Sequence, residues 1–271
     1  MMNNAENRVS DPDGELRHLF DRHQRVGNVH PEAVKEILER PGGGSIVRFR
    51  RTPPQMSYIA YSRLDPADLD DAIAEQVADL RENHRPFEWF VMDHDQPPEL
   101  EERLRTHGFQ YEEDEVILML DLRDAPFALL APVQADIRPI TTREGLEDVI
   151  AVLEGVYGRP YAWVRGRMGD HLEIPDYLSV YAAYVDNQPV SAAWTYFTPN
   201  SPFAGLWGGA TLEPYRGRGL YTALLATRAQ EAMRRERRYL FLNASDMSQP
   251  IVKKLGFKVL MTLRAYEWEG H

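Results

Sequence analysis

Apolar and polar residues alternate along this chain with two different periods. Residues 68–83 place Leu69, Ile73, Val77 and Leu80 on one stripe, which is the spacing of an amphipathic helix. Residues 220–235 show a similar spacing and predict a second such helix. Short runs that are apolar or alternating predict strands at 46–50, 57–64, 88–92, 115–122, 206–212, 238–244 and 263–268. The pattern therefore favours a fold in which helices and strands are mixed along the whole chain.

Further helices are predicted where helix-forming residues are bounded by glycine or proline. Residues 15–27 and 31–39 are both expected to be helical, and Pro41 with the three glycines after it ends the second helix. Residues 99–106 form a short helix that Gly108 closes, and Ser248 can cap another that ends at Gly256. Residues 125–135 contain proline and are predicted to link two halves of the chain.

The predicted elements occur twice in the same order, as strand, helix, strand, short helix and strand. The ends of the two short helices also correspond, because Gly108-Phe109 in the first half matches Gly256-Phe257 in the second. We infer an internal repeat, with one domain at residues 1–124, the linker at 125–135, and another domain at 136–271.

Composition restricts the classes of protein to consider. The chain has 271 residues and a net charge of −11, which argues against a nucleic-acid partner. An acidic surface attracts cationic substrates such as amines, although it also serves solubility alone. The chain has no cysteine, its eight histidines show no ligand spacing, and no metal site is expected. No run approaches the ~18 apolar residues of a membrane helix. With no secretory signal at the N-terminus, we expect a cytoplasmic protein without a membrane partner.

The most informative segment joins the strand at 206–212 to the helix at 220–235. It contains two arginines and two glycines in alternation, from Arg216 to Gly219. Backbone N–H groups and the positive end of a helix dipole meet at such a turn, which suits a phosphate or pyrophosphate. The segment is not a nucleotide-hydrolase P-loop, because no Gly-Lys-Ser/Thr follows. It is not the dinucleotide fingerprint either, because Thr222 stands where a third glycine is needed.

The order Arg216-Gly217-Arg218-Gly219-Leu220-Tyr221 resembles the acyl-CoA pyrophosphate loop of the GCN5-related N-acetyltransferase (GNAT) superfamily, except that Tyr221 replaces the usual Gly or Ala. The short helix ending in Lys254-Leu255-Gly256-Phe257 resembles the C-terminal part of the same superfamily. The resemblance covers about residues 135–271. It implies an α+β fold of two GNAT-like domains, each a mixed, mainly antiparallel sheet flanked by helices.

The first half resembles the N-terminal partner domain of tandem GNAT proteins. It has no glycine in the corresponding turn, residues 61–67, where Asp65 and the nearby Asp68 would repel a pyrophosphate. We therefore expect a degenerate copy that binds no cofactor of its own, packs against the second half, and walls one side of the substrate site.

The resemblance implies an N-acetyltransferase that moves an acetyl group from acetyl-CoA, its cosubstrate, to an amine of a small molecule or peptide. It places the oxyanion donor at the backbone N–H of Leu212. Gly208 and Gly209 weaken a strand interior, which indicates either close approach of a ligand or a β-bulge. The residues that the resemblance assigns to the cofactor are Ala210, Thr211, Leu212, Arg216, Gly217, Arg218, Gly219, Leu220, Tyr221, Thr222 and Asn243.

Proton transfer is less determined by the resemblance. The position of the family's usual acid holds Val252 here, so Ser248 is a candidate acid, with capping of the helix as its other role. Asn243 either bonds the pantetheine arm or caps a turn. No base is singled out, and a non-catalytic acyl-CoA-binding sensor remains the alternative function.

The expected substrate loop, residues 157–177, holds Tyr161, Trp163, His171, Glu173, Asp176 and Tyr177. Three further aromatic residues either line an acceptor pocket or belong to the core, namely Trp194, Tyr196 and Trp207.

Overall fold

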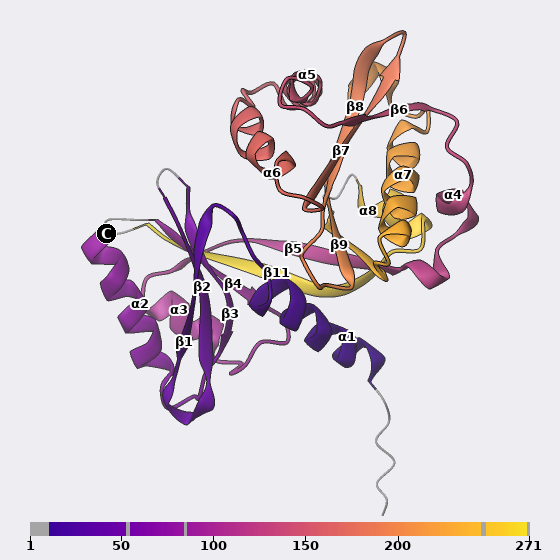
Figure 1. The fold of residues 1–271 in the computed structure, drawn as a ribbon. Coiled ribbons are helices and arrows are strands. Elements are labelled where there is room, and N and C mark those ends of the chain that lie inside the picture. The colour runs from indigo at the N-terminus through magenta and orange to yellow at the C-terminus, as the bar shows by residue number, and fades with distance from the viewer. Residues whose placement is uncertain (1–10, 53–54, 84–85, 245–247, 270–271) are drawn as a thin grey trace, which may run out of the picture.

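The computed structural model describes residues 11–52, 55–83, 86–244 and 248–269. Over these residues the strands form one continuous sheet of eleven, in the order β1-β2-β3-β4-β11-β5-β10-β9-β8-β7-β6 (Figure 1). The strands are β1 Ala33–Glu39, β2 Ser45–Arg51, β3 Ser57–Arg63, β4 Phe87–Met92, β5 Gln110–Asp121, β6 Asp136–Ile140, β7 Leu178–Val185, β8 Gln188–Tyr196, β9 Phe203–Thr211, β10 Tyr239–Asn243 and β11 Lys258–Trp268.

Helices cover both faces of this sheet. The α-helices are α1 Pro12–Phe20, α2 Leu69–Asn83, α3 Leu100–Thr106, α4 Phe127–Leu130, α5 Leu146–Tyr157, α6 Gly169–Leu172, α7 Leu220–Arg234 and α8 Gln249–Lys254. Two π-helical segments lie at Asp21–Val26 and Val164–Met168, and 3₁₀ turns lie at Pro41–Gly43, Leu122–Asp124 and Glu213–Tyr215. In the part of the chain described here, no helix combines the length and the apolar character needed to cross a membrane.

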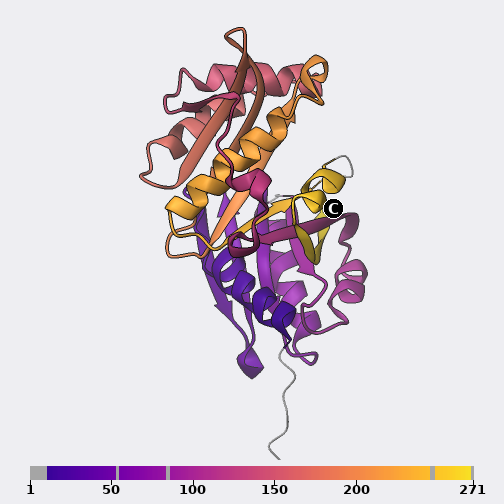
Figure 2. The same cartoon turned by 90° about the vertical axis from the view of Figure 1, so that its right-hand side faces the viewer.

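The two halves of the chain exchange their closing strands. β11, from the end of the chain, lies between β4 and β5 of the first half and pairs antiparallel with both. β5 in turn separates β11 from β10 and pairs with each of them. Figures 1 and 2 show these two long strands joining the lobe that carries α2 and α3 to the lobe that carries α5 and α7. The sheet is therefore shared, and each half completes the other.

Each half has its own buried core. In the first half, α2 and α3 pack Ile73 and Leu104 against strand residues that include Trp89, Tyr266 and Trp268. In the second half, α5 packs on one face of β7 and β8, and α7 packs on the other face together with α4 and α8. This arrangement leaves the end of β9, and the start of α7 that follows it, at the surface of the second half (Figure 1).

The internal repeat is visible in the geometry of both halves. β3 and β4 pair in parallel over only three residues before they separate, and β9 and β10 do the same. One extra residue also interrupts each preceding antiparallel pair, Ala60 in β3 and Gly209 in β9. The predicted mixed α+β architecture and the order of the repeated elements are confirmed by this structure.

One predicted helix is wrong. Residues 31–39 contain helix formers, but Ala33–Glu39 is the edge strand β1, paired antiparallel with β2 over its whole length. The glycine-rich turn at Pro41–Gly43 folds the two strands back on each other. Pairing with a neighbouring strand outweighs a helix propensity of a few tenths of a kcal/mol per residue.

The segment predicted as a linker, residues 125–135, is packed rather than extended through solvent. It contains the short helix α4, whose Leu129 is fully buried. The side-chain amide of Gln230 on α7 donates to the carbonyls of Leu129 and Ala131, at 3.0 and 2.8 Å. The connection between the halves is therefore fixed against the helix that begins at the Arg/Gly turn.

Candidate acyl-CoA cleft

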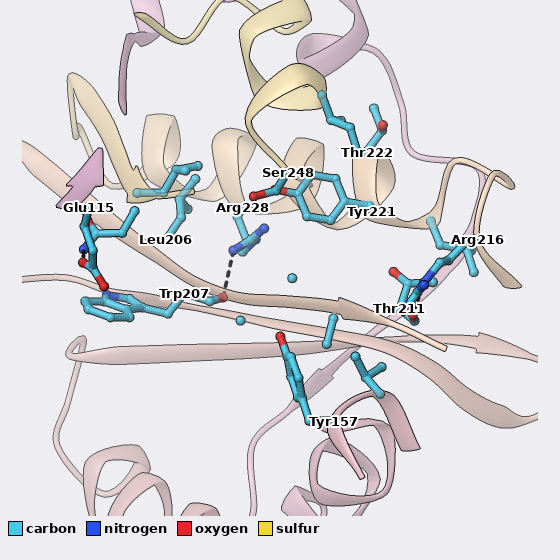
Figure 3. A pocket seen from close by; sticks show the side chains of 18 of the residues that line it. Glu115, Tyr157, Leu206, Trp207, Thr211, Arg216, Tyr221, Thr222, Arg228 and Ser248 are labelled. Atoms are coloured by element: carbon cyan, nitrogen blue, oxygen red, sulfur yellow. Dashed lines mark hydrogen bonds between the residues drawn. The ribbon is translucent and has the colours of Figure 1, made fainter. Parts of the chain in front are cut away.

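A cleft of about 990 Å³ opens where β9 and β10 diverge. The two strands are parallel partners only from Phe203 and Tyr239 to Gly205 and Phe241, so the remainder of β9 has one edge without a neighbouring strand among the described residues. Figure 3 shows Thr211 and Arg216 at one end of this cleft and Trp207 with Glu115 at the other. The cleft therefore runs along the free edge of β9.

Most of the residues predicted to hold the cofactor line this cleft. They are Ala210, Thr211, Arg216, Gly217, Gly219, Leu220, Tyr221, Thr222 and Asn243, together with Ser248. Leu212 and Arg218 are not among its lining residues. The guanidinium of Arg218 instead lies over the ring of Tyr215, 4.9 Å from the ring centre.

The Arg/Gly turn forms an open cradle at the N-terminus of α7. Gly217 and Gly219 have φ of +73° and +78°, which L side chains rarely adopt, and a Cβ at either position would have no described atom within 4 Å. The 15-residue helix begins at the next residue, so its first N–H groups and its dipole point into this space. Arg216 lies beside the cradle, and its Nε donates to the carbonyl of Thr211 at 3.1 Å. These donors suit a pyrophosphate.

The expectation for Leu212 is not compatible with the backbone geometry. Its N–H donates to the carbonyl of Val190 at 2.9 Å, as part of the β8–β9 ladder, and is therefore already used. In an antiparallel ladder successive N–H groups point to opposite edges of a strand. The N–H of the preceding residue, Thr211, consequently points to the cleft edge of β9. Sequence position alone does not fix this alternation, because the bulge at Gly209 changes it.

Gly208 and Gly209 form a β-bulge, one of the two interpretations that the sequence left open. Ala192 pairs with Ala210 and Ala193 pairs with Gly208, so Gly209 is the extra residue, and both glycines have positive φ. A Cβ on Gly208 would lie 2.4 Å from the Trp194 ring. The glycines are therefore required for packing, and the bulge turns their backbone toward the cleft.

Tyr221 points back along the cleft instead of toward the cradle. A Cβ on Gly209 would lie 2.8 Å from Cε2 of the Tyr221 ring, so the ring packs directly on the bulge. Burial raises the pKa of the Tyr221 hydroxyl above its usual value. The side chain that departs from the family pattern is thus a protonated phenol beside the bulge (Figure 3).

Ser248 and Asn243 take positions that the sequence left undecided. Ser248 occupies the N-cap position of α8, yet its side chain makes no capping hydrogen bond, and it lines the cleft. The side-chain amide of Asn243 donates to the carboxylate of Glu115 on β5. Val252, at the position of the family's usual acid, is fully buried in the core beneath α8 and does not reach the cleft.

Four glutamates from the central strands line the end of the cleft away from the cradle. They are Glu88 on β4, Glu112 and Glu115 on β5, and Glu267 on β11. Partial burial raises the pKa of the Glu88 carboxyl, and the negative charge of Glu267, its partner across the strands, adds to the shift. Three of these glutamates come from the first half, which thus walls one side of the cleft, and the acidic end suits a cationic ligand.

The segment expected to form the substrate loop lies mainly elsewhere. His171 is buried, and its ring nitrogens bond the Tyr196 hydroxyl at 2.8 Å and Glu32 at 3.2 Å. Tyr161 and Tyr177 are also buried. Of the residues 157–177, Tyr157 alone is among the cleft's lining residues in the described chain. Of the three aromatic candidates, Trp207 lines the cleft, and Trp194 and Tyr196 are packed within the fold.

Sequence analysis missed the glutamates and Arg228, another lining residue. The glutamates come from three strands that become neighbours only through strand exchange, so no local pattern indicates them. Arg228 lies on the buried face of α7, at i+4 from Leu224, where an apolar residue is the usual choice. An arginine inside an apolar stripe was a signal that could have been found.

Comparison with known proteins agrees with this geometry. The model of the "Acetyltransferase (GNAT) family" matches residues 146–257, which contain β9, the Arg/Gly turn, α7 and α8. No curated protein gave a significant match.

Solved structures share the fold over nearly the whole chain. A GCN5-related N-acetyltransferase from Kribbella flavida is 16% identical, with a TM-score of 0.70 over 94% of this chain and 95% of that one. A tandem GNAT protein from the clavulanic acid biosynthesis pathway is 16% identical, with a TM-score of 0.66 over 93% and 87%. A GCN5-related N-acetyltransferase from Sphaerobacter thermophilus is 15% identical, with a TM-score of 0.59 over 93% and 84%. At these identities the likeness concerns the fold, including its paired halves.

Proposed function

We propose, from the GNAT acetyltransferase domain that residues 146–257 form, that this acyltransferase moves an acetyl group from acetyl-CoA to an amine. The observation that carries the proposal is a single cleft with a cationic glycine cradle at one end and four carboxylates at the other. The first end suits the pyrophosphate of CoA, and the second suits the ammonium form of an acceptor amine.

Direct transfer needs the amine, the thioester and the proton acceptor in one place. The acceptor amine loses a proton to a carboxylate of the acidic end, and its lone pair attacks the thioester carbonyl carbon. A C–N bond forms, the C–S bond breaks, and the thiolate of CoA leaves and takes up a proton. Glu88 is the carboxylate that we assign to the first step, because partial burial and the charge of Glu267 raise its pKa, which favours proton uptake from the amine.

In this proposal the backbone of β9 supplies the N–H donors that polarise the thioester carbonyl. N–H groups on the cleft edge, such as that of Thr211 and those turned by the bulge at Gly209, take the place of the engaged N–H of Leu212. Donors fixed in a strand need no reorganisation when negative charge develops on the carbonyl oxygen.

The cradle predicts a specific loss of affinity. Replacing Arg216 by Ala is expected to weaken acetyl-CoA binding by about 1.5–3 kcal/mol, the contribution of a charge-assisted hydrogen bond. Isothermal titration of the purified protein with acetyl-CoA, and then with a panel of amines, measures both binding and turnover. Arg234→Ala, an exposed arginine at the far end of the same helix, is the matched control. Equal affinity of Arg216→Ala and the wild type would refute the cradle, and binding without turnover would favour a sensor.

Tyr221 is the proton donor that we assign to the departing thiolate. The usual acid position on α8 holds the buried Val252, whereas the Tyr221 ring lies against the bulge and its raised pKa keeps the hydroxyl protonated at neutral pH. Tyr221→Phe keeps the ring and removes the proton. We expect kcat to fall by about tenfold or more with little change in acetyl-CoA affinity. An unchanged kcat would show that the thiolate leaves without this acid.

The first half is proposed to act without a cofactor of its own. Asp65 accepts a hydrogen bond from the N–H of Ala67 at 2.8 Å, and Asp68 pairs with Arg40 at 2.8 Å, so carboxylates occupy the start of α2. A pyrophosphate at this helix start would meet like charge. One acetyl-CoA per chain in the titration is the expected stoichiometry.

A further inference from the structure

Arg228 is a buried cation without an acidic partner among the described residues. Its side chain is 2% exposed, and no carboxylate of the described chain lies within ion-pair distance of it. Burial lowers its pKa to about 10, so the guanidinium still carries its charge at neutral pH. A buried charge of this kind is costly unless hydrogen bonds or an opposite charge compensate it.

Three backbone carbonyls accept hydrogen bonds from Nε and Nη1 of the guanidinium and none from Nη2. Nε donates to the carbonyl of Leu224 at 3.2 Å, and Nη1 donates to the carbonyls of Trp194 at 3.3 Å and Trp207 at 3.2 Å. Nη2 has no hydrogen-bond partner within the described residues. Nη2 is not fully enclosed by the described protein atoms. Because Arg228 lines the cleft, Nη2 faces the cleft. Figure 3 shows the guanidinium above β9, between the two ends of the cleft.

The pyrophosphate of CoA does not supply the missing anion. Arg228 lies eight residues after Leu220, which places it about 12 Å along α7 from the cradle. Its bond to Trp207 places it beyond the bulge at Gly208 and Gly209, on the side away from Arg216. The part of the cleft that Nη2 faces is therefore the part that receives the acyl group and the acceptor.

We infer that Arg228 binds a carboxylate of one of the two reactants, either at the far end of the acyl chain or on the acceptor amine. This inference rests on the proposed acyl transfer and specifies its substrate class. A guanidinium with two free N–H groups presents the geometry that a carboxylate oxygen accepts. The carboxylate takes no part in bond making, because the thioester and the amine react as before.

Matched pairs of ligands distinguish the two sources. Titration compares malonyl- and succinyl-CoA with propionyl- and butyryl-CoA, which have the same chain lengths but end in methyl. In parallel, acetyl transfer to amino acids is compared with transfer to the amines made by removing their carboxylate. We expect one of the two carboxylate series to be favoured by about tenfold or more, in Kd for the acyl chain or in kcat/KM for the acceptor.

Variants then assign the preference to this residue. Arg228→Gln is expected to abolish it, Arg228→Lys to retain part of it, and Arg234→Gln on the same helix to leave it unchanged. If Arg228→Gln does not fold, the wild-type comparison and Arg228→Lys decide. Equal handling of both pairs, or a preference that survives in Arg228→Gln, would overturn the inference and leave Arg228 as a clamp on the β8 and β9 carbonyls. Failure of every acyl-CoA to bind would instead overturn the proposed function.

Discussion

Replacing Trp268 by Ala is expected to lower the free energy of unfolding by about 3–5 kcal/mol, although only three residues of the sequence follow it. Its side chain is 3% exposed and is packed in the core that α2, α3 and β4 form. Arg81 on α2 lies over the indole, 5.9 Å from the ring centre. Removing the ring therefore leaves a cavity in the core of the first half. Urea unfolding followed by circular dichroism measures the loss.

The location of the effect tests the strand exchange itself. Hydrogen exchange of Trp268→Ala should lose protection in α2 and β4 more than in β7 and β8, because β11 pairs with β4. Lys258→Ala, an exposed position at the other end of β11, is the control and should cost less than about 0.5 kcal/mol. A loss of protection confined to the second half would mean that β11 does not complete the first core.

Local sequence patterns predicted which helices and strands form in this protein better than they predicted which strands pair with each other. The stripe of Leu69, Ile73, Val77 and Leu80 identifies α2, and the Arg/Gly turn identifies the start of α7, because both signals lie within one turn or one helix face. The exchange of β5 and β11 depends on pairing between residues about 150 positions apart, and no period in the sequence carries that information. The edge strand β1 was missed for a different reason, because its helix-forming residues concealed a strand that pairs with the adjacent β2.

The candidate site likewise contains features that the local sequence predicts and features that depend on long-range pairing. The cradle residues are consecutive, so a short motif locates them. The N–H expected as the donor at Leu212 already bonds Val190, because a bulge reverses the alternation of N–H groups, and the two glycines that make the bulge indicate it without fixing its register. Glu88 and Glu267 become neighbours only in the shared sheet. The acidic end of the cleft therefore could not be predicted from the sequence alone.

Replacing Glu88 by Gln is the substitution expected to reduce catalysis most. As the proposed base, its carboxylate removes a proton from the amine, and general bases of this kind contribute about 10²–10⁴ in rate. We expect kcat to fall by about 10²–10³ while acetyl-CoA affinity stays within about twofold, since the cradle lies at the other end of the cleft. Release of the CoA thiol with the best amine of the panel measures this. Glu39→Gln, an exposed carboxylate on β1 outside the cleft, is the control.

The pH dependence of kcat/KM tests the same assignment of Glu88 as the base. Glu88 accepts a proton only as the carboxylate, so the rate must fall as the pH drops through its pKa. Burial and the charge of Glu267 raise that pKa above the ordinary value of 4.5, which moves the acid limb of kcat/KM above pH 4.5. Glu267→Gln removes the neighbouring charge, so the limb should shift to lower pH while turnover persists. An acid limb that stays in place in Glu267→Gln and in Glu88→Gln would assign the base to another group. An acid limb that shifts in Glu267→Gln and is lost in Glu88→Gln identifies Glu88 as the group that takes the proton.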